Sequence, residues 1–256
     1  MDNVIVITNP PSPGTSFTEH TDATILKCYD FLESCTLTTI SYQDFQKKLS
    51  TTKNLKESNL RCIWPMLRYA GLVSYDKEVN VKTFFTKSGT QYVEVLKLLD
   101  YLREPDISLQ NADGYNEALK LRTILIRCAL VSIAKSSGCS YSKAILQTFR
   151  FLRRYNSIDV VEFAYLAYGM QQGAGDPVDI VSSLVADHRS GNNIGIKLTV
   201  RDDAKGTIQQ KESLSWMTSY GYILALLEQA GVVSKKDGKF YINSGAADDF
   251  ENALVE

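Results

Sequence analysis

Histidine and cysteine are scarce in this sequence, and long apolar runs are missing. The two histidines, His20 and His188, exclude a histidine-rich metal site and argue against a histidine-based catalytic site. The five cysteines have no paired short spacing, so we expect reduced, mostly buried thiols in a cytoplasmic protein. No stretch reaches the roughly 20 apolar residues of a membrane span. The first residues also lack the basic region of a secretory signal.

The overall composition is that of a soluble globular protein. Hydrophobic residues make up 44% of the chain and charged residues 22%, with a formal net charge of −1. A nucleic-acid surface must therefore come from local segregation of charge. We expect a binding or scaffolding protein without catalytic residues, cofactor or metal. Asp187, Asp203 and Lys205 are the nearest match to a metallonuclease core, and a nuclease is the least favoured of three functions.

The N-terminal third predicts a winged-helix order of elements. Residues 9–18 contain three of the six prolines and predict an extended arm. Apolar residues at helical spacing then predict three helices, the second beginning at Ser41 and the third ending before Gly71. Two short strands, 72–75 and 79–85, are expected to flank a polar tip, and a further helix follows.

A similar pattern recurs near the C-terminus. Residues 66–74 and 226–234 share Leu, Ala, Gly, Val and Ser at equivalent positions, and both copies reach a Ser-Gly pair before another helix. We therefore expect residues 57–89 and 217–245 to superpose as a helix plus a two-stranded hairpin.

The predicted fold class is mainly α with short β-hairpins. Tandem winged-helix units are joined by a helical middle region, in which Asp176 and Pro177 begin one helix. The expected division is an extended arm at 1–19, an N-terminal winged-helix unit at 20–102, a helical middle domain at 103–204 and a C-terminal winged-helix unit at 205–256.

Basic residues are concentrated in two places. No acidic residue occurs from Ala118 to Ile158, so the arginines of this stretch either engage phosphates or pair with acids such as Asp179, Asp187 or Glu162. The third predicted helix is the one that enters a major groove in a winged-helix unit, and an ordinary polar face is its alternative. The phosphate candidates are Lys47, Lys48, Arg150, Arg153 and Arg154, and the base-reading candidates are Asn59, Arg61 and Arg68.

The matching C-terminal helix is apolar and aromatic instead. Trp216, Met217 and Tyr220 are candidates for a partner interface, and plain core packing is the alternative for all three. A protein–protein scaffold built from winged-helix units is therefore the second function that the sequence indicates.

Three features resemble the DNA-recognition part of type II restriction endonucleases of the FokI and AlwI kind. They are the repeated helix–glycine–hairpin unit, the segment 157–166, and the segment 179–189, which ends in Arg189. The likeness covers about residues 20–255, and the chain ends where a nuclease domain would begin. The resemblance implies a non-catalytic, sequence-specific module that binds double-stranded DNA in a restriction-like system. It also implies a recognition fragment, or a subunit whose catalytic partner is a separate chain.

Overall fold

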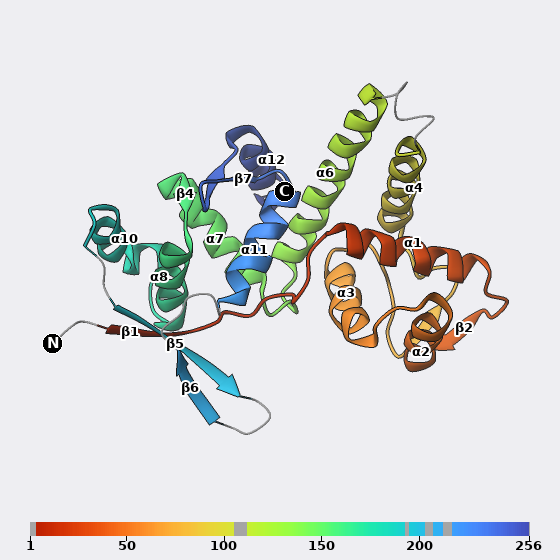
Figure 1. Cartoon of the computed structure of the whole chain (residues 1–256), viewed down its shortest axis with the longest axis horizontal. Coiled ribbons are helices and arrows are strands. Elements are labelled where there is room, and N and C mark those ends of the chain that lie inside the picture. The colour runs from red at the N-terminus through yellow and green to blue at the C-terminus, as the bar shows by residue number, and fades with distance from the viewer. Residues whose placement is uncertain (1–3, 105–111, 193–194, 203–206, 212–216, 256) are drawn as a thin grey trace. The chain divides into compact units, whose positions relative to one another are not determined.

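The computed structural model describes residues 4–104, 112–192, 195–202, 207–211 and 217–255. They form a mainly helical protein with a few short strands, as the sequence predicts (Figure 1). Within these residues none of the helices combines the length and apolar character that crossing a bilayer requires. The chain divides into two compact units. Unit 1 comprises Met1–Gly14, Ser140–Glu228 and Val232–Asp248, and unit 2 comprises Thr15–Cys139, Gln229–Gly231 and Asp249–Glu256.

Unit 2 contains the three N-terminal helices and two longer ones. The side chain of Thr18 caps the first helix, and Ser41 caps the second by accepting a hydrogen bond from the backbone N–H of Asp44. The helix that the sequence predicts from Ser41 is therefore confirmed. The elements are α1 (Glu19–Glu33), β2 (Thr39–Ser41), α2 (Tyr42–Lys53), α3 (Glu57–Tyr69), β3 (Glu78–Asn80), α4 (Lys87–Leu102) and α6 (Ala112–Lys135).

An aromatic cluster forms the core beneath α2 and α3. The ring centroid of Phe84 lies 4.9 Å from that of Phe45 and 5.5 Å from that of Trp64, and all three side chains are fully buried. Burying each such side chain contributes roughly 1.5–3 kcal/mol. The inner face of α3 is formed by apolar residues at helical spacing, and Leu60, Ile63, Trp64 and Leu67 are all buried.

The predicted hairpin at 72–75 and 79–85 is wrong in detail. Strand β3 pairs antiparallel with β2, placing Val79 opposite Ile40, and only an isolated bridge joins Val73 to Phe85. The side chain of Asn80 accepts hydrogen bonds from the backbone N–H groups of Lys82 and Thr83, which turns the chain and ends the strand.

Unit 1 contains two three-stranded sheets, ordered β1-β5-β6 and β4-β8-β7. Asp176 caps a short helix with Pro177 at its first position, as predicted. Gln229, the last residue of α11, and residues 249–255 of α12 belong to unit 2. The elements are β1 (Val4–Thr8), α7 (Ser142–Tyr155), β4 (Ser157–Ile158), α8 (Val160–Gln171), α9 (Pro177–Ile180), α10 (Ser182–Arg189), β5 (Gly195–Asp202), β6 (Thr207–Lys211), α11 (Thr218–Gln229), β7 (Val233–Lys236), β8 (Lys239–Ile242) and α12 (Ser244–Val255).

The N-terminal strand β1 pairs in parallel with β5, and β5 pairs antiparallel with β6 (Figure 1). Strand β5 lies within residues 192–206, a polar stretch that contains glycine. The hairpin β7–β8 turns at Asp237 and Gly238, both with positive φ. Asp-Gly suits the tightest hairpin turns because both residues tolerate that conformation.

The two repeated segments share local geometry. Residues 61–70 and 221–230 have the same order of buried, half-buried and exposed positions. Gly71 and Gly231 end the two helices with φ of 71° and 73°. The next backbone N–H, at position 72 or 232, donates to the carbonyl of Leu67 or Leu227, at 2.9 Å in both copies. The superposition of the whole segments stays a prediction.

The closing Ser-Gly pairs do not coincide. Ser88-Gly89 are the second and third residues of α4, whereas Ser244-Gly245 are the first two residues of α12. A Cβ on Gly89 would lie 1.9 Å from the carbonyl oxygen of Leu72, while a Cβ on Gly245 would meet nothing within 4 Å. Glycine is therefore required at position 89 and not at position 245.

Candidate nucleic-acid interface

The exposed stripe of α3 carries two of the three predicted base-reading residues. Arg61 and Arg68 are seven residues apart, which is about two helical turns, so both project from one face. Both side chains are exposed. Asn59 lies roughly 160° away around the helix, and its side-chain nitrogen Nδ2 is 2.9 Å from Nε2 of His20. The structure therefore brings Arg61 and Arg68 together and separates Asn59 from them.

Arg61 has an acidic neighbour on its own helix. Its Nη2 lies 3.6 Å from Oε2 of Glu57, one turn earlier, and both side chains are largely exposed. Exposed pairs of this kind are worth about 0–1 kcal/mol, because solvent screens them. A phosphate or base edge can replace Glu57 as partner at little cost.

Arg68 is held by aromatic rings instead. Its guanidinium carbon Cζ lies 5.3 Å from the ring centroid of Tyr75 and 5.5 Å from that of Tyr69. The ring of Tyr75 stacks on that of Tyr42, with centroids 4.6 Å apart and planes 2° from parallel. Burial raises the pKa of both Tyr42 and Tyr75 above the ordinary value of 10.0, so both phenols are neutral at physiological pH. Neither tyrosine is among the predicted site residues, because nothing in the sequence around Tyr42 or Tyr75 shows that the two rings stack.

Lys47 and Lys48 are exposed on α2, whereas Phe45 and Leu49 of the same helix are buried. Within the described part of the chain neither lysine forms an ion pair with a carboxylate. The nearby segment 75–83, which contains β3, adds exposed Lys77 and Lys82, and α2 to α3 add Lys53 and Lys56. The α2–α3 part of unit 2 thus has more basic than acidic side chains on its surface.

The three arginines of α7 are paired within unit 1. Arg150 Nη1 lies 3.7 Å from Asp176, Arg153 Nη1 lies 2.8 Å from Asp248, and Arg154 contacts Asp179. This is the intramolecular pairing that the sequence left open as the alternative, with Asp179 as an expected partner. Any phosphate at this helix would have to displace these carboxylates.

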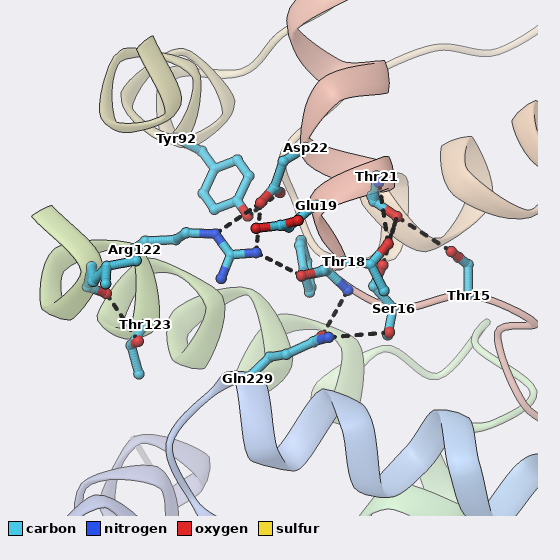
Figure 2. Close-up of polar contacts among 12 residues, drawn as sticks. Thr15, Ser16, Thr18, Glu19, Thr21, Asp22, Tyr92, Arg122, Thr123 and Gln229 are labelled. Atoms are coloured by element: carbon cyan, nitrogen blue, oxygen red, sulfur yellow. Dashed lines mark hydrogen bonds and ion pairs between the residues drawn. The ribbon is translucent and has the colours of Figure 1, made fainter. Parts of the chain in front are cut away.

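Two further arginines of the acid-free stretch bind within unit 2. Arg122 donates from Nε to Asp22 at 2.9 Å and from Nη2 to the carbonyl of Phe17 at 2.6 Å, and Asp22 also accepts from Tyr92 (Figure 2). Burial raises the pKa of Asp22, and Arg122 opposes the shift. Arg127 bonds the carbonyl of Ala230. Both arginines therefore join distant segments of unit 2.

A buried polar cluster in unit 1 connects the segments 157–166 and 179–189. Asp159 and Glu162 form a capping box at the start of α8. Arg189 Nε donates to Glu162 at 2.6 Å, and the Glu162 side chain is fully buried. His188 and Lys239 both contact Asp159. Arg189 and Lys239 are thus the cationic partners of the two carboxylates. Among the described residues, no group of three His, Cys, Asp or Glu could hold a metal ion.

The aromatic interface candidates lie on α11 or just before it. Trp216 lies outside the described residues. Met217 is 3% exposed, and Tyr220 packs edge-on against Phe163 and Phe240. Burial raises the pKa of Tyr220 to about 12. Met217 is thus buried and Tyr220 half-buried against rings of unit 1, as core packing would have it, and a partner interface stays a prediction.

Helix α11 also lacks the cations of α3. With the burial patterns aligned, Gly221 and Glu228 take the places of Arg61 and Arg68. The exposed stripe of α11 is consequently not basic.

Of the three residues considered for a nuclease, the structure describes only Asp187. Asp203 and Lys205 fall outside the described residues, and Asp187 is exposed on α10.

The cysteine prediction is partly wrong. All five are free thiols, but only Cys28 and Cys139 are buried, and Cys128 is exposed. Cys28, Cys62 and Cys128 lie on helices, and the helix faces that carry Cys62 and Cys128 are not fully covered.

No protein-family model and no curated protein matches this sequence. Among solved structures the chain is similar to a binding domain of an endonuclease. That domain comes from the BpuJ1 endonuclease and was crystallised in complex with pyrene- and phenanthrene-modified DNA. The TM-score is 0.51 at 11% identity, over 99% of this chain and 86% of that chain. The predicted resemblance to an endonuclease recognition region is thus confirmed at the level of the fold.

Proposed function

We propose that this chain is a non-catalytic module that binds double-stranded DNA in a sequence-specific manner. The observation that carries the proposal is the shared fold with a domain crystallised on DNA, which extends over nearly the whole chain. The exposed basic surface of α2 and α3 supports it, because phosphate neutralisation supplies most of the sequence-independent affinity for DNA.

We further propose that winged-helix units at 20–102 and 205–256 flank the helical middle, with the arm at 1–19 before them. The local geometry shared by residues 61–72 and 221–232 supports this repeat. Strand β4 pairs with β8, so residues 157–158, which precede the proposed unit at 205–256, also belong to the sheet β4-β8-β7.

Within this proposal the α3 face reads bases and α2 contacts phosphates. Arg61 and Arg68 share the stripe that would enter a major groove, and Lys47 and Lys48 lie on the neighbouring helix. Asn59 would have to leave His20 to contact a base. The three arginines of α7 contribute only where phosphates replace their carboxylate partners.

In this restriction-like system, a separate nuclease chain would cleave the DNA. We further propose that the present chain is related to the DNA-recognition part of restriction endonucleases of the FokI and AlwI kind. Incubation of the purified protein with plasmid DNA and Mg²⁺ tests the non-catalytic part. We expect the plasmid to stay intact, and cleavage that copurifies with the protein through successive columns would contradict it.

The test of DNA binding is selection from a random duplex pool, followed by sequencing of the bound fraction. We expect a short enriched site, and an affinity whose logarithm falls linearly with the logarithm of salt concentration. A variant with Arg61→Ala and Arg68→Ala is the matched control and should lose the enrichment while retaining weak binding. Absence of duplex binding even at low salt would contradict the proposed function.

A further inference from the structure

Arg68 differs from the other arginines in its partners. Among the arginines whose side chains the structure describes, it alone has no carboxylate within ion-pair distance. Its contacts are the rings of Tyr69 and Tyr75. An exposed guanidinium keeps its five donors for water or a ligand when only aromatic faces hold it.

Three elements converge to hold this guanidinium. Arg68 comes from the last turn of α3, Tyr42 from the first turn of α2, and Tyr75 from the segment 75–83. Gln46 Nε2 donates to the Tyr42 hydroxyl at 2.9 Å, which fixes the outer ring of the stack. A planar guanidinium above stacked rings loses little further conformational entropy when it binds.

The chemistry of this arrangement suits one base. Two parallel N–H donors of a fixed guanidinium match O6 and N7 of guanine in the major groove, which is the commonest specific contact between a protein and DNA. We propose that Arg68 reads a guanine in the target site, and that the Tyr42–Tyr75 stack positions it. This inference rests on the proposed function.

Of the two repeated helices, only α3 carries an arginine at this position. The position equivalent to Arg68 on α11 is Glu228, whose carboxylate only accepts hydrogen bonds and is repelled by phosphates. Arg61 is a weaker candidate for a fixed reader, since its partner is the exposed Glu57.

The experiment uses the full chain and the selected duplex, with each guanine replaced in turn by 7-deazaguanine, which lacks the N7 acceptor. For the unmodified protein we expect one position at which Kd rises roughly 5- to 150-fold. For Arg68→Ala we expect a comparable loss on the native duplex and no further loss at that position. Arg61→Ala is the matched control and should keep the full sensitivity there.

The positioning role has its own readout. Tyr75→Phe keeps the ring and should keep the sensitivity to 7-deazaguanine, whereas Tyr75→Leu should lose most of it with an unchanged salt slope. Arg68→Lys keeps the charge but not the planar fork of donors, so it should reduce the sensitivity and keep the salt slope. If Arg68→Ala remains fully sensitive at every guanine, the inference fails while DNA binding stands. If the unmodified protein binds no duplex, the proposed function fails and the inference fails with it.

Discussion

Replacement of Arg189 by methionine should destabilise the protein far more than the same change at Arg61. Glu162 is fully buried, and Arg189 supplies its charged partner at 2.6 Å. Removing one member of a buried pair leaves an uncompensated charge, which costs about 3–5 kcal/mol. Since 35% of the Arg189 side chain is exposed, we expect the lower end of that range.

The assay is equilibrium unfolding in urea, followed by far-ultraviolet circular dichroism. Arg61→Met is a matched control, because it removes an arginine–glutamate pair that is exposed on both sides and worth about 0–1 kcal/mol. The double variant Glu162→Gln with Arg189→Met should recover part of the loss, since no charge is then left buried. Equal effects of the two methionine substitutions would refute the view that the buried pair stabilises unit 1.

Three further predictions concern acid stability, a glycine and salt dependence. Burial alone would raise the pKa of Asp159, but hydrogen bonds from a backbone N–H, a histidine and a lysine lower it below 3.8. The stability that the charged Asp159 contributes is therefore lost as the pH falls through this lowered pKa. Acid titration of Asp159→Asn should show a smaller acid-induced loss of stability than the unmodified protein shows. Gly89→Ala should destabilise by about 1–3 kcal/mol because its Cβ meets a backbone carbonyl, whereas Gly245→Ala, in open space, should leave the Tm unchanged or raise it slightly. The double variant Lys47→Ala with Lys48→Ala should flatten the slope of log K against log salt by up to about 2 × 0.9 without changing the preferred site. Alanine at the three arginines of α7 should change this slope little. Equal slopes for the unmodified protein and the double-lysine variant would count against phosphate contacts on α2.

Local signals in the sequence account for most of the helices. Ser41 caps α2, Pro177 begins α9, and Gly71 ends α3, because each of these positions is set by a neighbouring backbone group. The repeat follows from the same kind of signal, since glycine at positive φ fixes the turn after each helix.

Long-range pairing could not be read from the sequence. The apolar residues Val4–Thr8 give no sign that their partner is β5, nearly two hundred residues later. The helical spacing of Arg150, Arg153 and Arg154 predicts a shared face, but only the fold brings Asp248 to it. Part of the candidate site was predictable, because it depends only on local sequence. The residue type and spacing of Arg61 and Arg68 could be read from α3, while the tyrosine stack that holds Arg68 depends on the fold.

The most direct test of DNA recognition is a fluorescence anisotropy titration of the selected duplex and of a scrambled duplex of equal length and composition. Both titrations use the full chain at one stated salt concentration near the physiological value. We predict that the selected duplex binds at least about 10³ times more tightly, as specific sites generally do. Equal affinity for the two duplexes, or binding to neither, would contradict the account.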